Sequence, residues 1–339
     1  MNELLEPFVG PAAVTEALAW AVIEGGELRS GTIGCEPAAI FDLASLTKVL
    51  GTVSTVAILL EEGALKLEQP IGELLPETHA SLAAATVADL LHHRAGLLAF
   101  SETLAEDLEG RPSQRLAGLR HRVAQLPLKH RPGSVVYSDL GFILLSWICS
   151  RLGRPVDASR QLPGWPRFVV PPLDRQHPIC YFLPSGRCAD GHPLLARVND
   201  PTCRAVGAVG CGHAGWYGTI GSVACAARGW LDLACGRSSY LPAAARQLIA
   251  RDGSGRTAGF DVPTPGGTTG GGWSDQSFGH LGYTGTAMWI DPAADRAAVL
   301  LSNRTWPDGS DRGIGDLRRA FFGAVAAAPA RVVDGGQRR

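Results

Sequence analysis

The stretch that decides the fold reads FDLASLTKVLGTVSTVAILLEEG, from Phe41 to Gly63. Its apolar residues recur at positions 46, 49, 50, 53, 56, 57 and 60, which is the spacing of a helix that is apolar on most of its sides. The pattern therefore predicts a buried helix that begins near Ser45, with Gly63 as its C-terminal cap.

Strand patterns lie on both sides of this helix, near the two ends of the chain. Residues 17–33 read as two short strands around the turn Glu24-Gly25-Gly26. Residues 286–292 and 297–303 read as a second pair of strands, and an amphipathic helix follows at 314–328. Strands at both ends with helices between them predict an α/β (α+β) fold. We expect one antiparallel sheet, built from both termini and flanked by helices, with an inserted and mainly helical subdomain.

The length of 339 residues fits one large domain or two closely packed subdomains. We assign residues 1–75 and 255–332 to the α/β subdomain that holds the sheet, and residues 76–254 to the helical subdomain. Residues 333–339 are expected to form a frayed tail.

The composition excludes several classes of protein. Lys and Arg number 31 against 32 Asp and Glu, so the net charge of -1 gives no basis for binding nucleic acid or an anionic membrane. The longest apolar window, 49–60, is far shorter than the roughly 20 residues of a membrane span, and residues 1–10 lack the pattern of a signal peptide. The eight cysteines include no Cys-x-x-Cys pair. We therefore expect reduced thiols, no metal, no cofactor and a cytoplasmic protein.

Ser45 and Lys48 form a Ser-x-x-Lys motif at the start of the predicted helix. Residues three apart lie on one face of a helix, so the Lys48 amine can reach the Ser45 hydroxyl. A lysine whose pKa is depressed by burial can accept the serine proton and make the serine a nucleophile. The alternative is an ordinary N-terminal serine with a solvated lysine one turn later. Catalysis is favoured because the helix is too apolar to solvate Lys48, and because only three lysines occur in a chain that otherwise uses arginine, which cannot act as a base.

Two further segments carry polar or aromatic side chains next to the start of a predicted helix or beside a predicted strand. Tyr137-Ser138-Asp139 precedes an apolar helix, so Ser138 or Asp139 is the expected N-cap and Tyr137 is expected on the exposed rim. Residues 279–286 place His280 and three glycines beside a predicted strand, where a ligand or a second backbone can approach closely. Each also has a structural interpretation: Tyr137 as a half-buried core aromatic, and His280 as an edge histidine with satisfied hydrogen bonds.

The order Ser-x-x-Lys, Tyr-x-Asp and His-x-Gly resembles the serine β-lactamase and penicillin-binding protein superfamily. The similarity is greatest to its branch of class C-like esterases and cytoplasmic serine hydrolases. The resemblance extends over nearly the whole chain and is carried by six segments in order: 41–48, 63–76, 90–97, 198–215, 278–292 and 300–304.

The resemblance implies a serine acyl-enzyme mechanism on a β-lactamase/transpeptidase-like fold. Ser45 would be acylated, and Lys48 and Tyr137 would share the general base and acid work. The backbone N–H groups of Ser45 and Tyr283 would form the oxyanion hole.

The resemblance also implies a set of substrate-binding positions: Asp139, His280, Leu281 and Gly282. Asp139 stands where asparagine is commoner, and a carboxylate there is expected to hold Lys48 charged, which shifts the base role towards Tyr137. His280 replaces a lysine, and Leu281 replaces a Thr or Ser whose hydroxyl helps to hold a substrate carboxylate. We therefore expect an esterase or amide-type hydrolase of small acyl substrates ahead of a β-lactamase.

Alternative functions stay open. The same acyl-enzyme could serve an acyltransferase of a biosynthetic pathway, a class C-like β-lactamase or a D-alanyl-D-alanine peptidase. A non-catalytic binding protein on the same fold is disfavoured by the intact motif residues. The expected partners are a small-molecule acyl substrate and an acyl acceptor in the transferase case, without nucleic acid or membrane. Three histidines, His92, His93 and His213, are expected to be structural and to bond loop backbone.

Overall fold

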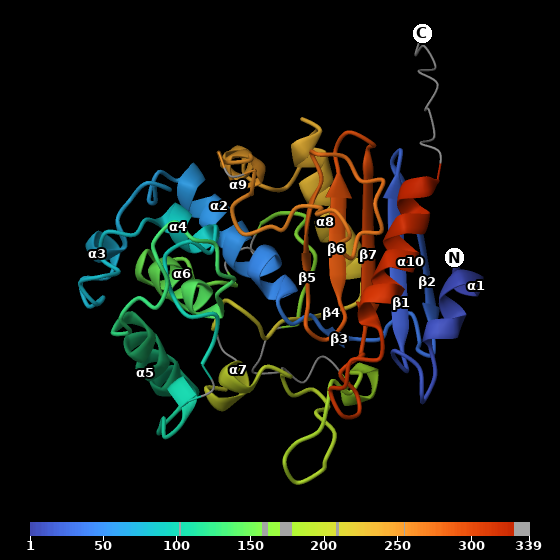
Figure 1. Ribbon diagram of the computed structural model, residues 1–339, viewed down its shortest axis with the longest axis horizontal. Coiled ribbons are helices and arrows are strands. Elements are labelled where there is room, and N and C mark those ends of the chain that lie inside the picture. The colour runs from blue at the N-terminus through green and yellow to red at the C-terminus, as the bar shows by residue number, and fades with distance from the viewer. Residues whose placement is uncertain (102, 158–161, 170–177, 208–209, 254, 329–339) are drawn as a thin grey trace.

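The two ends of the chain meet in one five-stranded antiparallel sheet in the computed structural model of the protein (Figure 1). The strands in the order β2-β1-β7-β6-β5 span Glu27–Ile33, Leu18–Glu24, Arg296–Ser302, Ala287–Asp291 and Phe278–Leu281. Strand β1 pairs with β7, with Leu18 opposite Ser302 and Glu24 opposite Arg296, and this pairing joins the N-terminal hairpin to the C-terminal strands. The predicted antiparallel sheet from both termini is confirmed.

The structure describes residues 1–339 apart from 102, 158–161, 170–177, 208–209, 254 and 329–339, so the predicted tail 333–339 lies outside the described residues. The α-helices are α1 (Asn2–Leu5), α2 (Ser54–Glu61), α3 (Ile71–Leu74), α4 (Val87–Leu91), α5 (Pro112–Ala124), α6 (Asp139–Arg151), α7 (Pro201–Ala205), α8 (Ile220–Ala234), α9 (Arg246–Ile249) and α10 (Ile314–Ala327). Short 3₁₀ helices are η1 (Glu6–Phe8), η3 (Thr103–Ala105), η5 (Ile179–Tyr181) and η6 (Ala243–Ala245), and η2 (Lys48–Val53) is π-helical. A separate two-stranded sheet pairs β3 (Phe41–Asp42) with β4 (Tyr217–Gly218).

Helices cover both faces of the main sheet (Figure 1). Helix α8 packs against β1, β6 and β7 on one face, and α10 packs against β7 on the other. Alternate side chains of β1 enter the two cores: Ala19, Ala21 and Ile23 join the one shared with α8, whereas Leu18 and Val22 join the one shared with α10. Helix α8 lies inside the 76–254 range assigned to the helical part, yet it packs on the sheet. The division of the chain into subdomains stays a prediction.

The buried helix predicted from 41–63 is confirmed as η2 followed by α2, and it contacts α6 in the helical part of the molecule. Every residue from Lys48 to Val53 is buried. Gly63 has a φ of +67°, and the N–H of Ala64 donates to the Leu59 carbonyl at 3.0 Å, as in the cap expected at this glycine. The π-helical geometry of η2 was not predicted.

Among the described residues, no helix combines the length and the apolar character that a membrane crossing requires.

Candidate active site

The buried carboxylate of Asp42 stabilises the turn that carries Ser45 by accepting backbone hydrogen bonds. Its Oδ1 accepts the N–H of Ala44 at 2.9 Å and its Oδ2 accepts the N–H of Asn199 at 2.7 Å. Burial raises the pKa of Asp42 to about 6, although the two hydrogen bonds act in the opposite direction. Ala44 has a φ of +45°, which non-glycine residues rarely adopt. This turn leaves Ser45 partly exposed, directly before the helix begins at Leu46.

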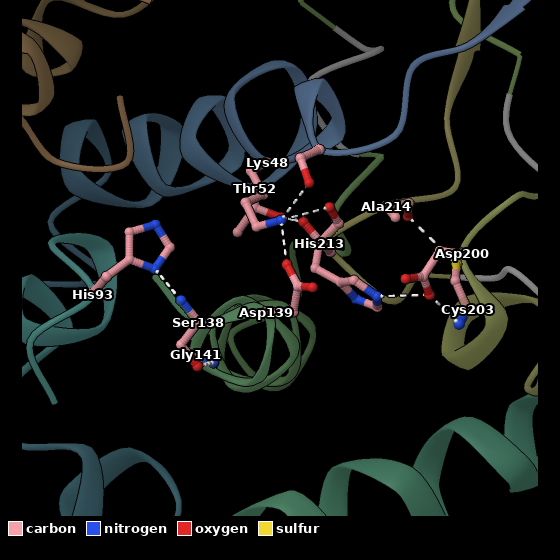
Figure 2. Close-up of polar contacts among 12 residues, drawn as sticks. Lys48, Thr52, His93, Ser138, Asp139, Gly141, Asp200, Cys203, His213 and Ala214 are labelled. Carbon is pink, nitrogen blue, oxygen red and sulfur yellow. Dashed lines mark hydrogen bonds and ion pairs between the residues drawn. The ribbon is translucent and has the colours of Figure 1, made fainter. Parts of the chain in front are cut away.

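The side chain of Lys48 is fully buried and its ammonium meets three acceptors (Figure 2). Nζ lies 3.0 Å from the Ser45 Oγ, 3.0 Å from the His213 carbonyl oxygen and 2.6 Å from the Asp139 Oδ1. Burial lowers the pKa of Lys48, but the Asp139 carboxylate and the Tyr137 phenol outweigh burial and raise that pKa above its usual value. The lysine is therefore an ammonium ion, as expected for a carboxylate at position 139.

Tyr137 stands at the rim of the site, just before α6, and is 41% exposed. Its ring lies 4.9 Å from the Lys48 ammonium, 4.5 Å from the His93 ring and 5.9 Å from the His280 ring. The predicted N-cap is Ser138, whose N–H donates to the His93 Nδ1 at 2.9 Å. Burial of the phenol raises the pKa of Tyr137, whereas Lys48 lowers it. The hydroxyl is therefore protonated at neutral pH.

The loop after β5 is fastened to the turn that carries Ser45. The Thr284 hydroxyl donates to the Asp42 carbonyl at 2.7 Å, and the Thr286 hydroxyl donates to the Leu43 carbonyl at 3.1 Å. Within the described part of the chain, the backbone N–H groups of Ser45 and Tyr283 donate no hydrogen bond. Both N–H groups are therefore available to a substrate oxygen.

The His-x-Gly segment, His280 to Gly282, lies at the end of β5 and presents no positive charge to a substrate at neutral pH. His280 is 2% exposed, and its Nδ1–H donates to the Leu281 carbonyl at 2.8 Å. Burial lowers the pKa of His280 to about 4, so the ring is neutral at pH 7. Leu281 is half-buried, and a Cβ added to Gly282 would lie 2.0 Å from the Thr286 hydroxyl oxygen. The glycine is therefore needed for the close approach of the loop.

Similarity to known proteins shows the family to which the chain belongs. A family model described as Beta-lactamase matches residues 4–321. The chain belongs to the β-lactamase family. It is 26% identical over 323 residues to an Escherichia coli K12 protein named a D-alanyl-D-alanine carboxypeptidase, a match that covers 83% of this chain and 73% of that protein.

Solved structures share the predicted β-lactamase/transpeptidase-like fold. A penicillin-binding protein homologue from Caulobacter crescentus has a TM-score of 0.71 at 19% identity, over 95% of this chain and 96% of that one. A class C β-lactamase from Rhodobacter sphaeroides has a TM-score of 0.67 at 18% identity, over 92% and 94%. The family makes the chain a serine hydrolase that acts through an acyl-enzyme, as the sequence predicts.

The motif residues were predicted from the sequence, whereas the supporting contacts of two acidic side chains, Asp42 and Asp200, were not. His93 bonds the backbone of the Tyr137 segment, and His92 bonds the Ala88 carbonyl at 2.8 Å, as predicted for structural histidines. For His213 the predicted bond to loop backbone was wrong, because its Nε2 lies 3.0 Å from the side-chain Oδ1 of Asp200. A helix N-cap signal, Asp200 before Pro201, was present in the sequence, but it does not reveal this partner.

Proposed function

We propose that Ser45 is the nucleophile of a hydrolase for small ester or amide substrates, with Lys48 and Tyr137 as its catalytic partners. The observation that carries the proposal is the distance of 3.0 Å between the Ser45 Oγ and the Nζ of a lysine that is 0% exposed. A solvated lysine one turn after an ordinary serine is hard to reconcile with that burial. Because the ammonium already donates protons, Tyr137 is the group that accepts the serine proton.

Acylation then proceeds with every proton accounted for. The Ser45 Oγ attacks the carbonyl carbon of the substrate, and its proton passes to the Tyr137 oxygen. In the same event the phenolic proton of Tyr137 passes to the leaving oxygen or nitrogen, so Tyr137 stays a neutral phenol while the C–O or C–N bond breaks. The Lys48 ammonium stabilises the negative charge that develops on these oxygens.

The carbonyl oxygen of the substrate is held by the N–H groups of Ser45 and Tyr283. One such donor is typically worth about 3–4 kcal/mol of transition-state stabilisation. In deacylation, water attacks the acyl carbon and gives a proton to the Tyr137 oxygen, while the phenolic proton of Tyr137 passes to the Ser45 Oγ as that oxygen leaves the acyl carbon.

The side chains around the Tyr283 loop favour the hydrolysis of esters over that of β-lactams. A β-lactam presents a carboxylate beside its scissile amide, and recognition of that group takes a fixed cation and a hydroxyl donor. His280 is neutral and Leu281 has no hydroxyl. Arg304 lies beside Tyr283, but it is only 8% exposed, and its Nε and Nη1 donate to the carbonyls of Tyr283 and Gly309. This arginine is an unsuitable replacement for the missing cation.

Two lost charged contacts of about 1.5–3 kcal/mol each correspond to about two to four decades in kcat/KM. The test compares kcat/KM for p-nitrophenyl butyrate and nitrocefin on one preparation. We expect a preference for the ester of about 100-fold or more. A preference for nitrocefin would contradict the ester assignment and support a class C-like β-lactamase.

A second candidate is a D-alanyl-D-alanine carboxypeptidase, which the name of the Escherichia coli relative favours. Release of D-alanine from an N-acylated D-alanyl-D-alanine peptide, measured on the same preparation, distinguishes the two. A kcat/KM for the peptide above that for the ester would select the peptidase.

We also propose that the protein works in the cytoplasm. All eight cysteines are free, and free thiols are typical of a reducing compartment. Five of the eight are exposed or partly exposed: Cys35, Cys180, Cys188, Cys225 and Cys235. Fractionation of a bacterial host that expresses the full chain should place it with cytoplasmic markers. Recovery with periplasmic markers or from the medium would contradict this location.

A further inference from the structure

Two neighbouring residues, Asn199 and Asp200, connect to both ends of the Ser-x-x-Lys motif. The first connection runs through Asp42, whose carboxylate accepts the N–H of Asn199 at 2.7 Å and the N–H of Ala44 at 2.9 Å. Ala44 directly precedes Ser45 and has the strained φ of +45°. Asn199 is thus tied, through one buried carboxylate, to the backbone that presents the nucleophile.

The second connection runs through His213 (Figure 2). The Asp200 Oδ1 lies 3.0 Å from the His213 Nε2, and the backbone carbonyl of the same histidine accepts the Lys48 ammonium at 3.0 Å. The imidazole is 2% exposed. Asp200 is fixed in turn as the N-cap of α7, where its Oδ1 accepts the N–H of Cys203 at 2.6 Å.

The Asp200–His213 contact is an ion pair at neutral pH. Burial opposes both charges, but each partner outweighs burial for the other. The pKa of Asp200 falls to about 2 because His213 lies beside it, and the pKa of His213 rises to about 9 because Asp200 lies beside it. Asp139 also raises the pKa of His213, so the charge of that carboxylate stabilises both the imidazolium and the Lys48 ammonium.

We propose that Asp42, Asn199, Asp200 and His213 form a positioning clamp, which sets the Ser45 hydroxyl against the Lys48 ammonium. The inference rests on the proposed role of Ser45 as the nucleophile. The His213 carbonyl accepts a hydrogen bond from one N–H of the Lys48 ammonium. The other two N–H groups are therefore directed at the Ser45 Oγ and the Asp139 carboxylate. The Asp42 connection fixes the other end of the motif, and the clamp therefore controls the distance between nucleophile and cation.

The competing interpretation is a buried ion pair that contributes only to stability. One connection ends at Ala44, which directly precedes Ser45, and the other ends at the carbonyl that accepts the Lys48 ammonium. A contact that served stability alone would not require either of these links to the catalytic pair. A matched control lies at the opposite end of β1 and β7 from the Tyr283 loop. There the Arg296 Nη2 lies 2.6 Å from the Glu24 Oε1, and the two residues are 3% and 7% exposed. This second buried pair has no contact with the motif.

The test measures the reactivity of Ser45 with a fluorophosphonate, in which the serine oxygen forms a bond to phosphorus, fluoride leaves and the serine proton passes to solvent. The variant Asp200→Asn keeps an oxygen to accept the Cys203 N–H but removes the negative charge. We expect its labelling rate constant to fall on the order of 100-fold, because small misplacements of reacting groups have effects of this size. Its kcat for p-nitrophenyl butyrate should fall in parallel with little change in KM. Glu24→Gln should lose stability and keep the wild-type labelling rate.

The outcomes separate the clamp from the proposed function. If the wild-type protein is not labelled on Ser45, the proposed nucleophile is wrong. If the wild-type protein is labelled and Asp200→Asn reacts at the same rate, the clamp is wrong. If Asp200→Asn does not fold, the double variant Asp200→Asn/His213→Gln removes both charges together and avoids an unpaired one. Labelling of that folded double variant at the wild-type rate would also overturn the clamp.

Discussion

Lys48 and Asp139 form an ion pair at the centre of the site, with 2.6 Å between Nζ and Oδ1. The lysine is 0% exposed, so water does not compete for its protons. The carboxylate overcomes the effect of burial and raises the pKa of Lys48. This pairing explains why we assign proton transfer to Tyr137 and electrostatic stabilisation to Lys48.

Replacing Asp139 by asparagine tests that assignment. In Asp139→Asn an amide oxygen can still accept from Lys48, but the charge is gone and burial then lowers the pKa of the lysine. We expect the alkaline limb of the kcat/KM profile to move to lower pH by roughly one unit or more. The measurement is the pH dependence of p-nitrophenyl butyrate hydrolysis, with folding checked by circular dichroism. An unchanged alkaline limb would show that the ammonium form is not the working one.

We expect the position of the loop that carries Tyr283, and hence the turnover of the enzyme, to depend on the Thr284 hydroxyl. Thr284→Val removes the hydroxyl that donates to the Asp42 carbonyl at 2.7 Å. Because the loop is then less firmly held, kcat should fall about tenfold or more with little change in KM. Thr55→Val is the matched control, since the buried Thr55 hydroxyl also donates to a carbonyl, that of Val156, at 2.9 Å. Equal kcat values for the two variants would mean that the loop contact has no catalytic role.

Leu281→Thr should improve the hydrolysis of β-lactams. The family resemblance implies that a hydroxyl at this position helps to hold a substrate carboxylate, and a charged hydrogen bond is worth about 1.5–3 kcal/mol. We expect kcat/KM for nitrocefin to rise about tenfold or more, and kcat/KM for p-nitrophenyl butyrate to change little. Leu281→Val, which lacks the hydroxyl, serves as the control. A similar gain in both variants would show that side-chain size, not the hydroxyl, limits β-lactam turnover.

The Asp200–His213 pair predicts a pH dependence of stability. The pKa of His213 is about 9 in the folded protein against a usual value of 6.5. Between these values the folded protein holds a proton that the unfolded chain has lost. The contribution of His213 to the free energy of unfolding is complete below pH 6.5 and declines towards pH 9, by at most about 1.4 kcal/mol per pH unit. Urea unfolding of the wild type and His213→Gln should give a stability difference that shrinks as pH rises through this window. A difference that is independent of pH would contradict the ion pair.

The sequence predicted those features that depend on local patterns. The spacing of apolar residues from Leu46 to Leu60 was enough for the buried helix, and the turn at Gly25-Gly26 was enough for the first hairpin. The Ser45–Lys48 contact followed from helical spacing alone. The order of the three motifs identified the family.

The features that were missed depend on contacts between distant segments. The partner of Lys48 at His213 is 165 residues away, and Asp42 meets Asn199 across 157 residues. Helical spacing and burial suggested a depressed pKa for Lys48, and only the family resemblance gave the expectation that Asp139 holds the lysine charged, as it does in the folded protein. No pattern in a single sequence encodes such pairings, because they are set by how the helices pack on the sheet.

The central claim is that Ser45 carries the acyl group, and intact-mass spectrometry tests it most directly. The wild type and Ser45→Ala are mixed with an activated ester, quenched in acid and weighed, and the labelled peptide is then mapped. We predict a mass increase of one acyl group in the wild type, located on Ser45, and no increase in Ser45→Ala, which should also lose turnover. Acylation of Ser45→Ala, or turnover by that variant within about tenfold of wild type, would contradict the account.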